Sequence, residues 1–523
     1  MVLFICDLLL YAVIPVTICF SNFSIQVNPR CYKTEVITYC LKKVILFFMV
    51  NVRGDELNKL NSFFERKESS LVVLYGEHLS GVSSLWQEFA EEKDSVYLKA
   101  SYASLREQSY LWAKRFGHFF NSEELYSMDS ALEAALLSGE ETSETFSVFT
   151  PGEDTAVEKE QKKKLIVISD FSLTAESDDA FLRTLFVFLS RHRQKNDVMI
   201  LLVTEKVFWA ENRLLEMLRG ENLHPDGFVR VYPLHFIDLV CAMNSQDFDE
   251  LMNVYAIFGG YSESYDYLNP ALSLKENIIN TFLDPDAPFC GYGTEILKNS
   301  FREPAVYATI LASLAEGRNK LNDLYLHTGF SRAKLSVYLK NLADISLTEK
   351  VKSYDTPGAE NTKKGVYRIY NPIVKFYFTF LYPREAELET MDAEEFYDTY
   401  IADEIESYCM KTFPVVCEEF LNLANERELL PISFIRYGEW VGKSGTIDFI
   451  AQDKERNFLF GFCNPKRGEL AYKDVLKMIS LSEDTHLTPD YFCFFSLDGF
   501  DEHVLEEMED KENVYLFDRT DLC

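Results

Sequence analysis

The chain has 523 residues, and a prior of about 150 residues per domain predicts about three domains. Its composition is 47% hydrophobic and 14% aromatic, which excludes a largely disordered protein. The net charge of −31 excludes broad nonspecific attachment to nucleic acid or to anionic membranes, although a local basic patch can still exist. The eleven cysteines form no CxxC pair and no cluster with histidine at metal-ligand spacing. We therefore expect no disulfide partner, no metal site and a reducing cytoplasm.

Residues 1–48 differ from the rest of the chain. Leu8 to Pro29 carries no charge and has the length of a membrane span. Pro15, and Asp7 where a signal peptide would have a basic residue, argue against a span or a signal peptide. Met49 then begins a sequence typical of a domain start. Two alternatives stay open for the segment: an N-terminal membrane anchor, or a leader upstream of the functional start.

The stretch Leu71–Leu85 organises the chain. It predicts a buried strand, a loop bounded by Gly76 and Gly81, and the start of a helix. This is the context of a P-loop, G-x-x-x-x-G-K-[ST], in which backbone N–H groups and a lysine hold phosphates and a hydroxyl holds Mg²⁺. The candidate nucleotide-binding residues are Gly76, Gly81, Val82, Ser83 and Ser84. Val82 stands where the lysine belongs, so the phosphate-binding cation is missing.

Buried strands and helices then alternate, which predicts a parallel sheet covered on both faces. The further strands are 95–100, 165–169 and 198–204. Ligands bind beyond the carboxyl ends of such strands, and the glycine loop, Asp170 and Thr204 all lie at those ends. We expect them to meet in one crevice. Residues 139–164 break the pattern and predict a loop or insertion.

From Phe236 onward the pattern is helical. Three short helices (305–316, 321–327 and 331–342) precede two strands around a polar loop (355–365), which predicts a winged helix-turn-helix. Ser331 is a natural N-cap of the recognition helix. Its cations, the weak candidates for DNA binding, are Arg332, Lys334 and Lys340. A long helix is expected over 400–428, followed by strands, a helix and further strands in an αβββαβ order typical of restriction-endonuclease-like domains.

Several motifs together resemble those of the archaeal-type P-loop ATPase family. Tyr255–Gly260 is similar to the family's Y-x-x-x-G-G, Leu274–Ile278 to its s-x-x-E-N-I, and Glu303–Leu311 to its E-P-x-x-Y-x-x-I-L. Arg53, Glu56 and Leu57 are similar to its opening R-x-x-E-L, and Tyr367–Ile369 and Phe376–Phe378 to the end of its winged helix. The resemblance implies an AAA+-like P-loop NTPase domain with a parallel sheet (49–235), a helical lid (236–300), a winged helix (301–384) and a C-terminal α/β restriction-endonuclease-like domain of unknown function (385–523).

The ATPase motifs depart from the family pattern. Its Walker B acid pair corresponds to Ser169–Asp170–Phe171, which supplies one carboxylate where two are needed. Asp170 is either a degenerate catalytic acid or a solvated carboxylate at a strand end. The polar sensor corresponds to Thr204–Glu205, and a glutamate there would repel a γ-phosphate. ATP and Mg²⁺ are therefore expected to bind weakly if at all.

The nuclease motif departs in the same way. A nuclease of this fold needs an Asp, then Glu-x-Lys on the next strand, with a helix glutamate often assisting. Asp448 supplies the first acid, and Glu418 or Glu419 could be the helix acid. Phe462 and Asn464 stand where the glutamate and lysine belong. Efficient nuclease activity is not expected.

Three functions are compatible with these motifs. The first is a pseudo-ATPase that acts as an interaction scaffold or a weak nucleotide sensor, with a protein partner. The second is an ATP-binding module that uses Ser83, Ser84 and Asp170 with a cation from a partner. The third is a DNA-binding regulator that acts through the winged helix.

Overall fold

The computed structural model describes residues 52–116, 127–138, 163–243, 247–355, 365–508 and 511–522, together with the backbone of 17–20 and 23–26. Within the apolar N-terminal segment, β1 (Thr17–Phe20) and β2 (Phe23–Gln26) form an antiparallel hairpin. The rest of residues 1–48, and nearly all of the expected insertion at 139–164, lie outside the described residues. In the described part of the chain, no helix is long and apolar enough to cross a membrane.

A five-stranded parallel sheet forms the first domain, as predicted. Its strands are β3 (Ser70–Gly76), β4 (Ser95–Lys99), β5 (Lys164–Ser169), β6 (Val198–Thr204) and β7 (Gly227–Val231), in the spatial order β4-β5-β6-β3-β7. The strands β5 and β6 are buried along their whole length because helices cover both faces. On one face lie α3 (Gly54–Phe64) and α4 (Val82–Glu91). The other face carries α5 (Leu105–Arg115), α6 (Met128–Leu137), α7 (Ser172–Ser177), α8 (Ala180–His192), η2 (Trp209–Leu214) and α9 (Leu215–Gly220).

Helices make up the middle of the molecule. The lid comprises α10 (Phe236–Met243), α11 (Phe248–Phe258), η3 (Ser262–Tyr267), α12 (Leu274–Ile278), η4 (Ile279–Leu283) and α13 (Tyr292–Ser300). The winged helix has α14 (Pro304–Ala315), α15 (Leu321–Thr328) and α16 (Arg332–Asp344), with the hairpin β8 (Thr348–Val351) and β9 (Val366–Ile369) as its wing. Ser331 caps α16 by accepting the Lys334 N–H. These elements confirm the predicted winged helix-turn-helix.

The chain continues from the wing through a run of short helices. They are α17 (Pro372–Phe376), η5 (Tyr377–Leu381), η6 (Tyr382–Arg384), α18 (Glu385–Thr390), α19 (Ala393–Tyr400), α20 (Ile405–Met410) and α21 (Phe413–Glu426). The single long helix expected over 400–428 was wrong. Pro414 has no N–H to donate to a preceding turn, and it lies in the first turn of α21, so the helix begins anew there.

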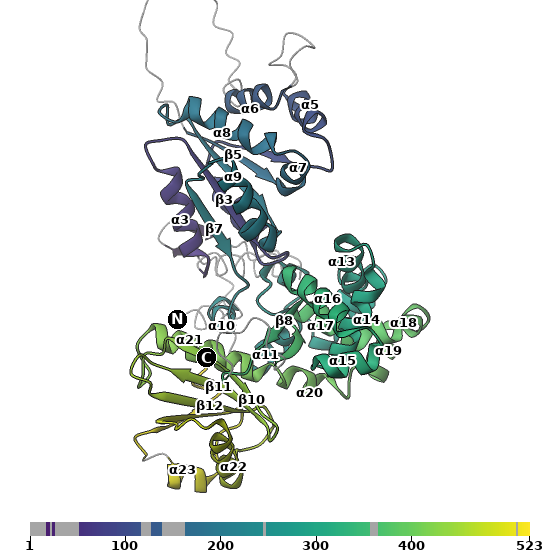
Figure 1. The fold of residues 1–523 in the computed structure, drawn as a ribbon, viewed down its shortest axis with the longest axis vertical. Coiled ribbons are helices and arrows are strands. Elements are labelled where there is room, and N and C mark those ends of the chain that lie inside the picture. Colours follow the sequence, from purple (N-terminus) through teal and green to yellow (C-terminus); the bar gives the residue numbers. More distant parts are fainter. Residues whose placement is uncertain are drawn as a thin grey trace, which may run out of the picture.

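The C-terminal domain is a second five-stranded sheet. Its strands are β10 (Arg436–Val441), β11 (Thr446–Gln452), β12 (Phe458–Asn464), β13 (Tyr491–Ser496) and β14 (Val514–Asp518), in that spatial order. The first three strands are antiparallel and the last two continue in parallel. One face packs on α21, and the other carries α22 (Tyr472–Ser482) and α23 (Glu502–Met508), with η7 (Glu483–Thr485) following α22. Figure 1 shows the P-loop sheet at the top, this sheet at the bottom, and the lid and winged helix to one side between them.

Candidate functional site

The P-loop turn joins β3 to α4 in a conformation that only its two glycines allow. A Cβ on Gly76 would lie 2.5 Å from the Val231 carbonyl oxygen and 2.6 Å from Val82 Cγ2. Gly81 is the N-cap of α4 and has φ 101°, in the left-handed region that favours glycine. The Val82 side chain is only 1% exposed and packs into the core beneath the turn. The P-loop pattern has a lysine ammonium at this position, and in this chain the position holds the apolar side chain of Val82, buried in the core.

The N-terminus of α4 already holds an anion, which is a carboxylate of this chain. The Ser83 N–H donates to Glu263 Oε1 at 2.9 Å, and the Ser84 N–H donates to the same oxygen at 3.1 Å. The Ser84 hydroxyl donates to it at 3.3 Å. A helix N-terminus favours an anion because its first N–H groups lack intrahelical partners. Glu263 therefore occupies the helix N-terminus at which the sequence predicts phosphate binding.

Other contacts hold the lid segment against the same turn. The Glu263 N–H donates to the Leu79 carbonyl at 3.1 Å, and the Tyr261 hydroxyl donates to Glu77 Oε2 at 2.6 Å. Burial raises the pKa of both carboxyls, Glu77 and Glu263, although hydrogen-bond donors partly offset this effect. The lid is therefore closed on the turn by contacts of this chain alone.

The charged groups at the predicted crevice pair with one another, and the two glycines, Asp170 and Thr204 are not among the residues that line the cavity described below. Glu205, after β6, accepts from His78 Nδ1 of the P-loop turn at 2.7 Å. Asp170, after β5, lies 3.7 Å from Lys99 Nζ and has φ 53°. Burial raises the pKa of Asp170, and the charge of Lys99 opposes this rise. The Thr204 hydroxyl donates to Ser172 at 3.2 Å instead of facing an open site.

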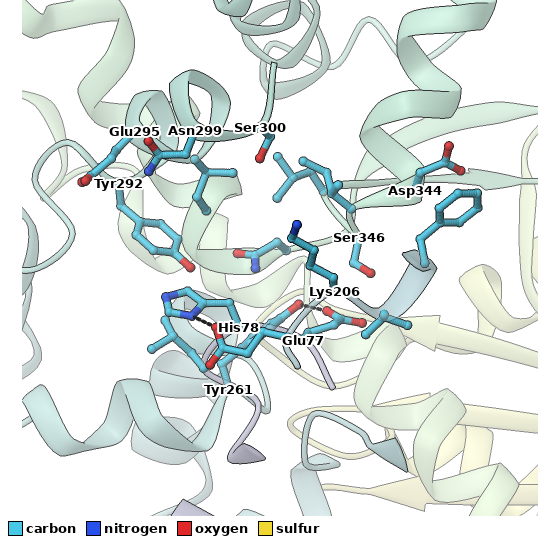
Figure 2. Close-up of a pocket in the computed structure, with 18 of the residues that line it drawn as sticks. Glu77, His78, Lys206, Tyr261, Tyr292, Glu295, Asn299, Ser300, Asp344 and Ser346 are labelled. Atoms are coloured by element: carbon cyan, nitrogen blue, oxygen red, sulfur yellow. Dashed lines mark hydrogen bonds and ion pairs between the residues drawn. The ribbon is translucent and has the colours of Figure 1, made fainter. Parts of the chain in front are cut away.

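A cavity of about 570 Å³ lies between the turn, the lid and the winged helix. Figure 2 shows Glu77, His78 and Tyr261 on one wall and Glu295, Asn299 and Ser300 on the opposite wall. Four carboxylates of the described residues line the cavity: Glu77, Glu205, Glu295 and Asp344. A lysine that also lines it, Lys206, is paired with Glu176 at 3.1 Å. The charged lining is therefore predominantly acidic and fits a polyphosphate poorly.

In the C-terminal domain the predicted nuclease acids Asp448 and Glu418 share two charged neighbours, Glu439 and Arg368. Asp448 on β11 accepts the Cys463 N–H at 2.9 Å, and burial raises the pKa of Asp448 to about 6. Burial, followed by the negative charge of Glu439 on β10, raises the pKa of Glu418 on α21 to about 7. Phe462 packs among the rings of the opposite sheet face, with Phe494 at 5.6 Å between centroids. The Asn464 amide lies 3.4 Å from the Ser496 hydroxyl.

A cation of the chain lies among these acids. Arg368 on β9 of the wing bonds to Glu439 through Nη2, and its Nε lies 3.0 Å from Glu349. The backbone of the wing's end also docks on strand β10, because the Tyr354 N–H donates to the Glu439 carbonyl at 2.6 Å. In the described ranges, no group of three or more His, Cys, Asp or Glu side chains could hold a metal ion.

The candidate DNA-binding cations of α16 make contacts within the winged helix. Arg332 donates to Asn322 at 2.6 Å and lies over the Tyr325 ring. Lys334 lies over the Phe330 ring. Lys340 is exposed, and its charge acts on Asp344. Glu419, the alternative helix acid, accepts the Phe236 N–H and the Tyr255 hydroxyl, both at 2.7 Å.

Sequence reasoning missed the residues that occupy both sites. Glu263 lies 180 positions from Ser83, and Arg368 lies 71 positions from Glu439. No local spacing links such pairs. The one signal for Glu263 was its place three residues after the Y-x-x-x-G-G motif, in the segment that the family resemblance makes a lid.

Comparisons with known proteins found one matching family, one curated relative and several solved structures of similar fold. Residues 377–475 match the DUF234 family, described as archaeal and bacterial proteins of unknown function. The chain is 24% identical over 487 residues to the uncharacterized protein MJECL04 of Methanocaldococcus jannaschii, covering 90% of this chain and 99% of that one. The Walker-type ATPase PABY2304 of Pyrococcus abyssi is 15% identical, with a TM-score of 0.43 over 62% of this chain and 95% of that one. The ORC2 protein of Aeropyrum pernix, solved in ADPNP–ADP complexes, is 11% identical, with a TM-score of 0.36 over 65% and 94%.

The DUF234 match covers the end of the winged-helix region and the first half of the C-terminal domain. It agrees with the motifs that run from Arg53 to Phe378, and with the parallel sheet, the lid and the winged helix that the structure shows in that order. The chain therefore resembles the archaeal-type P-loop ATPase family in its motifs and in the order of its parts, and residues 377–475 match the DUF234 family.

Proposed function

We propose that this protein is a pseudo-ATPase, a degenerate ATP-binding module that serves as an interaction scaffold or a weak nucleotide sensor. One observation carries the proposal: Val82 fills the position of the phosphate-binding lysine with a side chain sealed in the core. No rotation of that side chain brings a charge to a phosphate. Losing a charge-assisted contact of this kind weakens binding by about 10- to 150-fold.

The acid chemistry supports the same proposal. Hydrolysis needs one carboxylate for Mg²⁺ and a polar group that orients the attacking water. Asp170 is a single acid paired with Lys99, and the neighbouring Glu205 is bonded to His78. Ser83 and Asp170 are the residues that would hold Mg²⁺, but the acidic lining of the cavity opposes the phosphates that Mg²⁺ would accompany.

The alternative is an ATP-binding module that takes its cation from a partner. The cavity supports this version, because residues of the P-loop turn, the lid and the winged helix all line it. A partner's arginine could enter there and meet Glu205 or Glu295. The two versions differ in whether the purified chain alone binds nucleotide.

The test is a titration of the purified chain with fluorescent ATP, with and without Mg²⁺, beside a hydrolysis assay. We expect weak binding and no turnover above the buffer blank. A family member that has the P-loop lysine is the positive control, and Ser83→Ala reports whether any binding uses this turn. Turnover similar to that control would contradict the pseudo-ATPase. Tight Mg²⁺-dependent binding lost in Ser83→Ala would contradict the inert scaffold.

A further inference from the structure

The P-loop turn is built as an anion site, and the anion is already present. Two backbone N–H groups and one hydroxyl converge on a single oxygen of Glu263, at 2.9, 3.1 and 3.3 Å. The same turn holds the Ser80 hydroxyl, which is fully buried and has no hydrogen-bond partner among the described residues. A buried hydroxyl without a partner is rare and costs stability, so this turn keeps a hydrogen-bonding capacity that its own described contacts do not satisfy.

A cation lies beside the turn. Arg53 is 9% exposed, and its Nη2 donates to the Ser80 carbonyl at 2.6 Å. The same nitrogen is 3.5 Å from the point where a Cβ on Gly81 would lie. Burial lowers the pKa of Arg53, and the charges of Glu56, Asp238 and Glu263 counter this effect, so the guanidinium is within electrostatic range of the Glu263 carboxylate. Arg53 therefore supplies positive charge near the position where Val82 supplies none.

Glu263 belongs to a short segment of the lid, η3, that contacts the turn of the P-loop domain. It lies in η3, three residues after Gly260, and a Cβ on Gly260 would lie 1.8 Å from the Leu234 carbonyl oxygen. Gly260 is therefore packed directly against residues 232–235, the strap that connects β7 to the lid. The bonds of Glu263 and Tyr261 to the turn attach the lid to the P-loop sheet beyond that point.

We propose that Glu263 is an exchangeable internal substitute for a phosphate group. When the η3 segment leaves the turn, the N–H groups of Ser83 and Ser84, together with Arg53, bind a diphosphate or triphosphate anion. Phosphate binding and lid closure then exclude each other, because both use the same two N–H groups. This inference rests on the proposed weak nucleotide sensor and gives its regulation: phosphate opens the lid instead of closing it.

The test compares the full chain with Glu263→Ala and Glu263→Gln, using inorganic pyrophosphate as the probe in isothermal titration. Apparent affinity is the intrinsic affinity multiplied by the fraction of molecules with a free turn, so removing the competitor strengthens binding. We expect pyrophosphate to bind about 10- to 100-fold more tightly to Glu263→Ala than to wild type. Glu263→Gln keeps an acceptor oxygen for Ser83 and Ser84 without the charge, and should lie between the two.

Glu295→Ala is the matched control, since it removes an exposed carboxylate of the same lid that lines the opposite wall of the cavity. Because it leaves the N–H groups of Ser83 and Ser84 occupied by Glu263, it should change the affinity much less than Glu263→Ala does. Adding Arg53→Met to Glu263→Ala should abolish most of the gain, and an undiminished gain would overturn the role of Arg53. Small-angle scattering should show a larger radius of gyration for wild type in saturating pyrophosphate.

Equal pyrophosphate affinity in wild type, Glu263→Ala and Glu263→Gln would overturn the proposal. If the wild-type chain becomes more compact in pyrophosphate, the proposed opening of the lid is wrong. Neither result depends on turnover. ATP hydrolysis by wild type would defeat the pseudo-ATPase without changing these affinities, so the two failures can be distinguished.

Discussion

At the scale of single residues, each expected ligand position is occupied by a side chain with the charge of that ligand. Glu263 places a carboxylate on the N–H groups that would bind phosphate. Arg368 places a guanidinium among acids of the C-terminal sheet, at the position where the sequence analysis considered a positively charged metal ion. An unpaired buried charge is costly, so charged groups in these two places are stable when they are paired within the chain.

The acids of the C-terminal domain predict a pH dependence of stability. The pKa of Asp448 is raised from 3.8 to about 6 and that of Glu418 from 4.5 to about 7, mainly by burial. The folded state therefore binds more protons than the unfolded state between about pH 4 and pH 7. Their contribution to stability is greatest below pH 4 and is lost as the pH rises to about 7. We expect the melting temperature to fall by about 2–4 °C between pH 5 and pH 7.5.

Asp448→Asn combined with Glu418→Gln should remove most of that fall, because neither amide titrates. The measurement is differential scanning calorimetry of both chains at several pH values and constant ionic strength. An equal slope in the double variant would assign the effect to the overall net charge of −31 instead.

The sequence alone shows where the P-loop domain and the C-terminal domain depart from the family motifs, because a motif specifies which residue type belongs at each position. Val82, Asp170, Phe462 and Asn464 are of that kind. The side chains that reach these positions from distant segments could not be predicted, because no spacing rule links them to the motif. Glu263 reaches Ser83 only after the lid folds onto the P-loop sheet.

At the scale of elements, the wing is an attached part of the C-terminal sheet. The Val441 N–H donates to the Ser353 hydroxyl at 3.0 Å, and the Tyr354 N–H donates to the Glu439 carbonyl at 2.6 Å. Arg436 lies over the Tyr354 ring, 4.1 Å from its centroid. The wing thus covers the edge strand β10, whose open N–H and C=O groups would otherwise be free to pair with other chains.

Arg368→Met should weaken this attachment, because it leaves Glu349 and Glu439 without their shared cation. Arg368 and its two carboxylate partners are partly exposed, so we expect the free energy of unfolding to fall by about 1–2 kcal/mol. Urea denaturation monitored by tryptophan fluorescence measures it. Arg332→Met, on the exposed face of α16, is the control and should change stability by less than about 0.5 kcal/mol. A loss no larger than in this control would mean that the wing is held by its backbone bonds.

At the scale of the whole molecule, the lid, the winged helix and one face of the C-terminal sheet share a single hydrophobic core. It runs from Phe236 through Ile310 and Phe376 to Phe449 and Phe495. The P-loop sheet has separate cores on its two faces. The sequence predicted the order of these parts from their motifs, but not that three of them are fused, because helix and strand periodicity shows which faces are apolar and not which faces meet.

A fragment of residues 377–523 should therefore fail to fold, although it contains the whole C-terminal sheet. It lacks Phe376, whose ring packs 5.7 Å from Tyr408, and it exposes the apolar face of α20 and α21. Residues 236–523 keep that core and should fold. Near-ultraviolet circular dichroism and dye binding by exposed apolar surface distinguish the two fragments. A cooperative thermal transition in the shorter fragment would show that its sheet is an independent domain.

Glu419 on α21 receives the Phe236 N–H at the start of the lid and the Tyr255 hydroxyl from its second helix, so one side chain connects two domains. A rotation of the lid about the strap after β7 would carry the C-terminal sheet with it as a lever arm. An event of a few ångströms at the P-loop would thus be magnified at the far end of the molecule. A partner protein bound to the C-terminal sheet would then respond to the orientation of that sheet without contacting a nucleotide.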